Sequence, residues 1–443
     1  MSDYFQPPTG ADEITQARAN VDALVEFNRQ HIRDTCASAG VGAVESVGIV
    51  GGGMMGAAIA AASARCGLRV IVTDSSEDAL ARFPEELTAA LGAGGSPGDR
   101  EPASDSARLV QTAEDIKAIA PCELVIESVT EDAFVKRPLF AELEAKLDSI
   151  KVLASNTSTI SIAKLAASLA APERFCGIHF LRPVHERPLV EIVCGPDTGG
   201  SALATAVAYA DAIGKIPLVV NDSPGFLINR LLLPYVAEAM GLLIEGATIE
   251  AVEQTAVEFG MALGPFALLD EIGLDTALDC GWVFAGAYPD TLPTSPLLVA
   301  MVKAGRLGRK TGAGFFAYDD RSPDAKPNPD PAVDAIIARW ADEVQPHNQE
   351  TIASRLFLPM LLEATRVVQE KTVADPRLVD LGVIFGLGFP QSRGGLLYWG
   401  DCVGASEIVT MLRPLEHLGN RMRPTPLLLE AAEKGQRFYD TDD

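Results

Sequence analysis

His179 and Glu191 lie twelve residues apart in HFLRPVHERPLVEIV, and together they could carry out acid/base chemistry. An imidazole exchanges protons near neutral pH, and a neighbouring carboxylate can orient the ring and stabilise its charged form. Upstream, Gly51, Gly53 and Gly56 form a G-x-G-x-x-G sequence that can seat the pyrophosphate of a dinucleotide. An acid/base histidine beside a nicotinamide is what reversible oxidation of a secondary alcohol requires, because a hydride and a proton leave together.

The glycine-rich sequence lies in the context that dinucleotide binding requires. It follows a β-rich run at 46–50 and opens an alanine-rich helical segment, so the amides at the helix start would face a pyrophosphate. Eighteen residues after Gly56, Asp74 ends the next β-rich run, where it either accepts a hydrogen bond from the adenosine ribose or caps the next helix. No arginine follows closely to hold a 2′-phosphate, which favours NAD over NADP. The expected contacts are Gly51, Gly53, Met54, Met55, Gly56 and Asp74.

Two further polar residues, Ser158 in SNTST and Asn229 in INRLLLPY, stand where apolar strands and helices would not need them. Taken singly, each candidate has a structural alternative. Ser158 could cap a helix, and Asn229 could lie on a helix surface. His179 could be a hydrogen-bonded core histidine, and Glu191 a charge on an edge strand. The four residues indicate catalysis only as a set.

The composition excludes several classes of protein. At 443 residues the chain is too long for one ordinary core, which predicts two or three domains. The formal charge of −24 argues against binding to nucleic acid or to an anionic membrane, since either needs a basic face. An anionic substrate must therefore be met by a local cluster of lysines and arginines.

Cysteine usage and hydropathy suggest a cytoplasmic protein without a metal centre. The seven cysteines are scattered, without a C-x-x-C pair, and the five histidines do not cluster. The start MSDYFQPPTG lacks the apolar core of a secretory signal. The most apolar stretch, 226–244, is interrupted by Asn229, Arg230 and Glu238, which predicts a buried helix rather than a membrane span.

The order of β-rich and helical segments predicts an α/β domain followed by helices. From 46 to about 220, short β-rich runs alternate with helical segments, as in a mainly parallel sheet covered by helices. The sequence NDSPG then breaks the pattern, and a proline-rich stretch at 326–331 resembles a linker. We therefore expect a linker-like N-terminal helical extension at 1–44, a dinucleotide-binding domain at 45–220, a helical domain at 221–325 and a second helical domain at 326–443.

An internal repeat supports the second helical domain. The segment NRLLLPY, which starts at Asn229, recurs as SRLFLPM from Ser354, and both are followed by Glu-Ala. A Phe-Gly pair at 259–260 recurs at 385–386, so the offset is 125 residues in the first block and 126 in the second. Because Ser354 replaces the asparagine and no second glycine-rich turn exists, the second copy should be structural.

Five motifs in order, ASNTST, GIHFLRPVHERPLVEIV, DSPGFLINRLLLPY, MALGPFALLDEIGLD and GRKTGAGFFAY, resemble those of the (S)-3-hydroxyacyl-CoA dehydrogenases of fatty-acid β-oxidation. The doubled helical tail is similar to the dehydrogenase portion of the bacterial multifunctional α-subunit. Only about forty residues precede the first strand, so we expect the hydratase domain of that subunit to be absent. The resemblance implies a Rossmann-type domain followed by two tandem all-α domains like the C-terminal domain of 6-phosphogluconate dehydrogenase.

The resemblance also assigns roles to residues. It implies that His179 is the general base and Glu191 its electrostatic partner, while Ser158 and Asn229 hydrogen-bond the 3-oxygen of the substrate. It further implies that the NAD contacts include Ser158, Glu131 and Lys136 in TEDAFVK, and Lys310 in GRKTG. An acyl-CoA is the substrate that the resemblance implies.

Two departures from the family pattern leave the contact with CoA open. Arg182 stands where the family has a small polar residue, and it either contacts a CoA phosphate or the thioester, or pairs with Glu186. The helix after Asp74, and the glycine-rich stretch that follows it, lack the lysines that face CoA in single-function relatives. The candidates that could replace those lysines are Arg182, His185, Arg187 and Arg306.

Two other functions remain alternatives. One is a β-hydroxyacid dehydrogenase of the 6-phosphogluconate type, whose base is a lysine where this chain offers Asn229. The other is a non-catalytic scaffold with a dehydrogenase fold, which would need none of the four polar residues. Since an internal second copy can cover the face through which single-copy relatives pair, we expect a monomer, or a subunit docking onto separate hydratase or thiolase chains.

Overall fold

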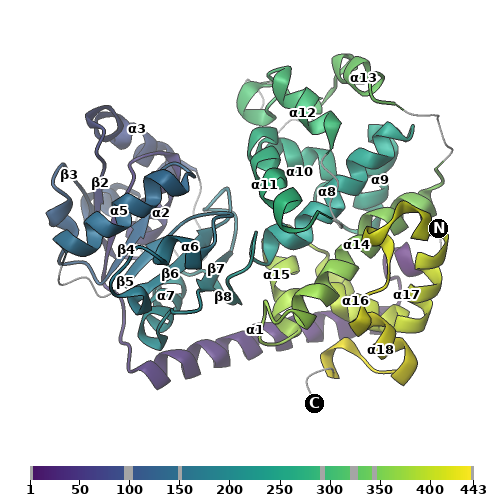
Figure 1. Ribbon diagram of the computed structural model, residues 1–443, viewed down its shortest axis with the longest axis horizontal. Helices are drawn as coiled ribbons and strands as arrows, with labels where there is room; N and C mark the ends of the chain where they lie inside the picture. Colours follow the sequence, from purple (N-terminus) through teal and green to yellow (C-terminus); the bar gives the residue numbers. More distant parts are fainter. Residues whose placement is uncertain are drawn as a thin grey trace. The chain divides into compact units, whose positions relative to one another are not determined.

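The computed structural model describes residues 3–93, 103–147, 152–289, 295–319, 328–341 and 347–440 (Figure 1). The chain forms two compact units: a helical unit, Met1–Leu24 with Leu227–Asp443, and a sheet unit, Val25–Phe226. Helix α1 (Ala11–Ala39) contributes residues to both. The expected domain boundary at 325 and most of the glycine-rich stretch after residue 93 lie outside the described residues. The boundaries at 44, 220 and 325 stay predictions.

The sheet unit confirms the predicted α/β class. Its single sheet has the order β3-β2-β1-β4-β5-β6-β7-β8, and neighbouring strands are parallel except for β6 and β7. The strands are β1 (Ser46–Val50), β2 (Arg69–Thr73), β3 (Val110–Ala113), β4 (Leu124–Glu127), β5 (Val152–Ser155), β6 (Phe175–Phe180), β7 (Leu189–Cys194) and β8 (Ile216–Asn221). The central strands β1, β4 and β5 are mostly apolar because they are buried on both faces, and each has one polar residue at an end.

Helices cover the two faces of this sheet (Figure 1). They are α2 (Met54–Arg65), α3 (Glu77–Gly92), α4 (Ala103–Ser106), α5 (Ala133–Lys146), α6 (Ile162–Ala166) and α7 (Gly200–Ala212). Side chains of α2, α3 and α7 share one core with Cys176 of β6. The adjacent Phe175 points to the opposite face, where its ring packs edge-on against Phe140 of α5 with centroids 4.7 Å apart.

A helical part follows the sheet unit, as the fold class predicted, and it comprises residues from Leu227 onward. Its first copy comprises α8 (Ile228–Ile244), α9 (Ile249–Phe259), α10 (Pro265–Ile272), α11 (Leu274–Ala287) and α12 (Pro296–Lys303). Strand β9 (Phe316–Ala317) pairs antiparallel with β10 (Asn328–Pro329), which precedes helix α13 (Pro331–Ile337). The second copy comprises α14 (Gln349–Gln369), α15 (Arg377–Leu387), α16 (Leu396–Val403), α17 (Ala405–Leu412) and α18 (Pro426–Lys434). No helix in the described part of the chain is long and apolar enough to cross a membrane.

Equivalent ion pairs between α8 and α14 join the two copies. Arg230 of α8 donates to Glu363 of α14 at 2.7 Å and to Glu370, just past its end, at 2.7 Å. Arg355 of α14 donates in turn to Glu238 of α8 at 2.7 Å and to Glu245. Each of these partners lies 125 residues from its counterpart, so the contact is reciprocal.

Buried carboxylates repeat in the two copies as well. Glu253 accepts hydrogen bonds from the first backbone amides of α10, and Asp380 accepts the corresponding bonds at the start of α16. Asp270 then binds the amides of Phe315 and Phe316, as Asp401 binds that of Phe438 near the end of the chain. The repeat therefore includes these buried carboxylates as well as the ion pairs of α8 and α14.

The N-terminal segment packs into the helical unit. Phe5 is fully buried, and its ring lies 5.8 Å from Trp399 and 6.4 Å from Phe259. The buried guanidinium of Arg393 donates to the carbonyls of Tyr4, Phe5 and Gln6. This segment is therefore part of a core.

Candidate active site

The glycine-rich turn between β1 and α2 has the shape that a pyrophosphate requires. Gly51 has a φ of +117°, and a side chain there would lie 2.5 Å from the Ser128 carbonyl oxygen. A side chain at Gly56 would lie 1.9 Å from the carbonyl oxygen of Gly51. At Gly53, by contrast, the space is open, which leaves the start of α2 accessible to an anion. Only glycine fits the first and third positions.

Asp74 lies beside this turn in a cavity of about 780 Å³. Its carboxylate accepts hydrogen bonds from the amides of Gly52 at 2.7 Å and Ser76 at 2.8 Å, so it fixes the turn as well as lining the cavity. Among the described residues of the lining, Lys146 is the one cation, and it pairs with Glu142. The described lining therefore offers a ribose its acidic partner and contains no arginine for a 2′-phosphate.

His179 and Glu191 face each other on β6 and β7. They are directly paired in the antiparallel register of these strands, and His179 Nδ1 lies 2.7 Å from Glu191 Oε2. Glu191 is fully buried and His179 is 4% exposed. The ring of Phe226 lies beside the imidazole, with centroids 5.7 Å apart. The carboxylate favours a hydrogen on Nδ1, which leaves Nε2 as the proton acceptor.

Ser158 lies on the turn that follows β5, and Glu131 holds this turn. Glu131 Oε1 accepts hydrogen bonds from the Thr157 hydroxyl at 2.6 Å and from the amides of Ser158 at 2.8 Å and Thr159 at 3.1 Å. Lys136, which was expected at the cofactor, is 1% exposed and lies 2.6 Å from Glu127 Oε1. Its Nζ is also 3.3 Å from Glu131 Oε2.

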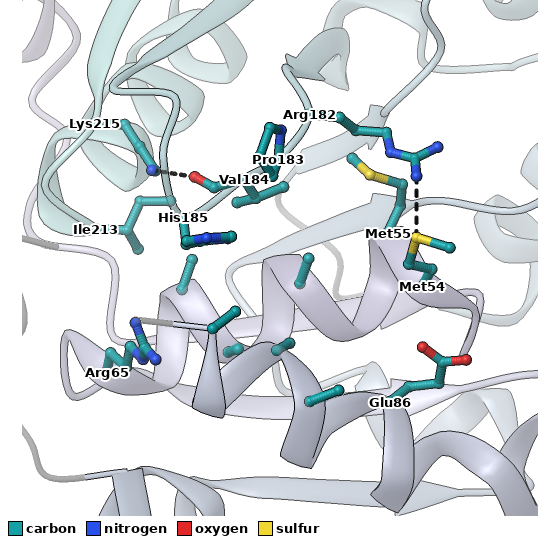
Figure 2. A pocket seen from close by; sticks show the side chains of 16 residues that line it. Met54, Met55, Arg65, Glu86, Arg182, Pro183, Val184, His185, Ile213 and Lys215 are labelled. Atoms are coloured by element: carbon teal, nitrogen blue, oxygen red, sulfur yellow. Dashed lines mark hydrogen bonds between the residues drawn. The ribbon is translucent and has the colours of Figure 1, made fainter. Parts of the chain in front are cut away.

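Arg182 lies at the edge of a second cavity, of about 260 Å³ (Figure 2). Its guanidinium donates to the sulfur of Met54, the first residue of α2, at 3.1 Å. The pairing with Glu186 is not found, since the ion pair that Glu186 makes in the described structure is with His185, at 3.4 Å. Residues of α2, α3 and the 182–185 segment line this cavity together with Arg65, Ile213 and Lys215.

Two of the other basic candidates, Arg187 and Arg306, have structural partners, and so does Lys215, which lines the same cavity. Arg187 Nε donates to the carbonyl of Arg182 at 3.3 Å. The buried Nζ of Lys215 donates to the carbonyls of Val184 at 2.5 Å and Arg187 at 2.9 Å, which fixes the segment carrying Arg182 and His185 (Figure 2). Arg306 pairs with Asp330 at 2.6 Å in the helical unit. Of the basic candidates from the sequence, Arg182 and His185 line this cavity.

Comparison with known proteins identifies the family. Residues 46–223 match the NAD-binding domain of 3-hydroxyacyl-CoA dehydrogenase, and residues 225–318 match its C-terminal domain. The chain is 36% identical to FadB2 of M. tuberculosis, a match that covers 63% of this chain and 100% of that one with a TM-score of 0.58. The chain belongs to the 3-hydroxyacyl-CoA dehydrogenase family. The predicted resemblance, fold class and NAD cofactor are thereby confirmed.

Longer relatives of this dehydrogenase match more of the chain. The 3-hydroxybutyryl-CoA dehydrogenase of Escherichia coli is 25% identical over 88% of this chain and 98% of its own, with a TM-score of 0.74. The dehydrogenase part of multifunctional enzyme 1 from C. elegans is 28% identical over 88% of this chain and 90% of its own, with a TM-score of 0.65. The likeness therefore includes much of the second helical copy.

The sheet unit of the dehydrogenase brings together the glycine-rich turn, Asp74 and the predicted polar residues Glu131, Lys136, Ser158, His179 and Glu191. Asn229 and Lys310 belong to the helical unit. Asn229 lies in the first turn of α8, and Lys310 pairs with Asp275 at 2.6 Å.

Sequence reasoning missed two residues of this site. Glu127 is fully buried and binds both Lys136 and the Ser155 hydroxyl, the latter at 2.6 Å. Asn156 Oδ1 accepts a hydrogen bond from the amide of Phe180, the residue after His179, at 2.9 Å. The available signal was a polar residue at the end of an apolar strand, in LVIE and in VLASN.

Proposed function

We propose that this dehydrogenase oxidises (S)-3-hydroxyacyl-CoA to 3-oxoacyl-CoA in fatty-acid β-oxidation, or carries out the reverse reduction. The observation that supports it most is the buried pair of His179 and Glu191, 2.7 Å apart, in the unit that also carries the NAD turn. Reversible alcohol oxidation needs a proton acceptor whose charged form is stabilised when the hydride leaves. The pair supplies both functions.

His179 acts as the general base through Nε2, because Nδ1 is engaged by Glu191. The glycine-rich turn and Asp74 would hold NAD, which would supply the acceptor for the hydride that leaves C3 of the substrate. Glu191 keeps the ring in the required tautomer and stabilises the imidazolium as the hydroxyl proton arrives. In the reductive direction the protonated His179 returns this proton to the 3-oxygen. Ser158 and Asn229 would hydrogen-bond the same oxygen, and these bonds would stabilise the negative charge that develops on it.

The CoA part of the substrate would lie against the second cavity. Helix α3 contains no lysine, but Arg182 and His185 line this cavity from the 182–185 segment. A guanidinium and an imidazole can hold a phosphate in place of the lysines that the family carries. The apolar part of the lining comes largely from alanines of α2 and α3.

The test is the oxidation of NADH by acetoacetyl-CoA, which is measured as the loss of NADH absorbance. The wild type should turn over, and His179→Asn should lose about three to four powers of ten in kcat while still binding NADH. The matched control is His417→Asn, which changes an exposed histidine of the helical unit. A full rate in His179→Asn, or no turnover with any 3-oxoacyl-CoA, would refute the proposal.

A further inference from the structure

We propose that Cys176 and Cys194 form an oxidation site, at which a peroxide converts the two thiols into a disulfide between β6 and β7. Both cysteines are free thiols in the structure. Cys176 is the second residue of β6, and Cys194 is the last residue of β7. These strands also carry His179 and Glu191, so the bond would brace the part of the sheet that holds this pair. Formation of the bond does not depend on which substrate the enzyme takes.

The two cysteines face each other across the antiparallel ladder. Near this end of the ladder Gly177 pairs with Val193, so one further step in the same register places Cys176 opposite Cys194. Cross-strand partners project from the same face of a sheet. Cys176 belongs to the core that α2 and α7 cover, whereas His179, three residues along β6, projects from the opposite face. The disulfide would therefore form on the side of the sheet away from the imidazole.

Backbone hydrogen bonds identify the kind of cross-strand pair that the cysteines form. The carbonyl of Cys194 accepts a hydrogen bond at 2.9 Å from the amide of Asp222, which follows β8, so the backbone of Cys194 faces β8 and not β6. The Phe180 amide donates to Asn156, just past β5, and Cys176 has the same orientation because it lies four residues earlier. The cysteines are therefore a non-hydrogen-bonded pair, in which the Cα atoms are about 4.5 Å apart and the side chains are closest.

The end of the ladder gives this pair room for a disulfide. Beyond the cysteines, the Thr198 hydroxyl donates to the Phe175 carbonyl at 2.7 Å and accepts from the Gly195 amide at 2.9 Å. Because this hydroxyl lies between the two backbone groups, the chains are farther apart there than a direct hydrogen bond would hold them. Disulfides span Cα separations of about 4.4–6.8 Å, so a position between a direct pair and a bridged pair suits one.

The two thiols differ in their access to solvent. Cys176 is fully buried, and this burial, together with the neighbouring thiol of Cys194, raises its pKa to about 12. Cys194 is partly exposed, and its Sγ donates to the Gly195 carbonyl at 3.7 Å. Burial, and then the charge of Asp222, raises the pKa of Cys194 as well. Cys194 is thus the thiol that a small oxidant reaches first, and Cys176 is the thiol that reacts with it afterwards.

The oxidation has two balanced steps. The Cys194 thiolate attacks one oxygen of hydrogen peroxide and breaks the O–O bond, which gives a sulfenic acid and a hydroxide that takes up the proton lost from Cys194. The Cys176 sulfur then attacks the sulfenic sulfur and forms the S–S bond, while the sulfenic oxygen leaves as water with the proton of Cys176. Two thiols and one peroxide give one disulfide and two waters. The peroxide oxygens receive the two electrons that the sulfurs lose.

The test oxidises the purified chain and maps its cysteines. Because the thiolate is the reacting form, hydrogen peroxide is added at about pH 9, and its concentration is raised until the exposed Cys402 is oxidised. Remaining thiols are alkylated with iodoacetamide after unfolding. Trypsin leaves Cys176 and Cys194 on one peptide, 175–215, because Arg182 and Arg187 are both followed by proline. This peptide should carry no alkyl group, and it should carry two when a phosphine reductant precedes alkylation.

Two results of this map would overturn the proposal. One is a 175–215 peptide that still carries two alkyl groups when Cys402 has been oxidised. The other is oxidation of Cys194 to a sulfinic acid without a bond to Cys176. The map is made on the wild type, so its result does not depend on whether a variant folds.

Thermal unfolding of the same sample tests whether the bond braces the strands. A disulfide that closes the loop 176–194 restricts the unfolded chain, so the melting temperature of the sheet unit should rise by about 5–10 °C and return on reduction. Cys194→Ser should show no rise. Cys122→Ser, which changes a buried cysteine outside the pair, is the matched control and should behave as the wild type. An equal rise in Cys194→Ser, or a disulfide without any rise, would contradict the bracing role.

Discussion

At the scale of single residues, the site depends on how strand ends place polar groups. His179 and Glu191 are cross-strand partners of an antiparallel pair, so their contact follows from the register of β6 and β7. Both side chains are buried, so water does not compete with the imidazole for the carboxylate of Glu191. The rate of the reaction should therefore depend more on the charge of Glu191 than on its shape.

Glu191→Gln should lower kcat by about three to four powers of ten, because the amide cannot stabilise the imidazolium and can select the wrong tautomer. The double variant with His179→Asn should be no slower than His179→Asn alone, since the pair acts as one unit. Steady-state rates of acetoacetyl-CoA reduction measure both effects. NADH binding should be retained in each variant. A glutamine variant with a wild-type rate would contradict the assigned role.

At the scale of elements, α8 and α14 are joined by buried ion pairs rather than by apolar contact alone. Arg355 is 2% exposed, and it binds Glu238 of α8 and Glu245, just past the end of α8. Removing an arginine from such a set leaves buried negative charge without a partner.

Arg355→Met should therefore destabilise the helical unit by about 3–5 kcal/mol. Arg230→Met should have a similar effect, because Arg230 makes the equivalent contacts in the other direction. Chemical unfolding followed by circular dichroism gives both values. Lys434→Met, which breaks an exposed pair with Glu430, serves as the control and should leave stability nearly unchanged. Equal effects of all three substitutions would contradict this account.

The buried carboxyls predict how stability depends on pH. Burial raises the pKa of Asp380 to about 7 and that of Asp270 to about 6, although both accept backbone hydrogen bonds. In an unfolded chain an aspartate titrates near pH 4, so the folded unit binds these protons more tightly. Their contribution to stability is complete below about pH 4 and is lost as the pH rises through about 7.

The melting temperature of the helical unit should therefore be lower at about pH 8 than at about pH 5. Asp380→Asn removes one of the titrating groups, so it should flatten this dependence even if it lowers stability throughout. Thermal scans across the range measure the slope. Glu433→Gln, at an exposed position of α18, should leave the slope unchanged. The same slope in Asp380→Asn and wild type would contradict the assignment.

At the scale of the whole molecule, segments that are far apart in the sequence pack together within the helical unit. Its N-terminal Phe5 packs against the ring of Trp399, and the two helical copies pack against each other through α8 and α14. Both features bury apolar surface within one chain.

Phe5→Ala should destabilise the helical unit by about 3–5 kcal/mol, because a fully buried ring leaves a cavity. Tyr4→Ala is the matched control. That side chain is 38% exposed, and its carbonyl, which binds Arg393, remains. Thermal unfolding compares the two. A larger loss in Tyr4→Ala than in Phe5→Ala would contradict the assignment of this stability to the ring of Phe5.

We expect the purified protein to be a monomer, because the second copy occupies the face of α8 on which a second chain would otherwise pack. Light scattering coupled to size exclusion measures the mass directly. A symmetric dimer formed through the first helical copy would contradict the expectation. Co-purification with separate hydratase or thiolase chains would leave it intact.

The sequence predicted what local patterns and short spacings determine. The G-x-G-x-x-G turn, Asp74 and the strand–helix alternation are local, and the pairing of His179 with Glu191 needs only a hairpin. The burial of Lys136 could not be foreseen, because it depends on Glu127 lying in a central strand. The packing of Phe5 was missed for a similar reason, since Arg393 and Trp399 are nearly four hundred residues away. Arg182 and Glu186 are close in sequence, yet their side chains take different partners.

Because the contact of α8 with α14 is reciprocal, each helical copy carries both sides of it: an arginine, and the two glutamates that the arginine of the other copy binds. Arg230 and the pair Glu238 and Glu245 are the positions that their counterparts in the second half recognise. A polypeptide that ends after the first helical copy would therefore expose both the guanidinium of Arg230 and the carboxylates of Glu238 and Glu245 on one face. Two such fragments could join about an isologous twofold axis and restore the ion pairs that Arg230 and Arg355 make between the two copies in the intact chain.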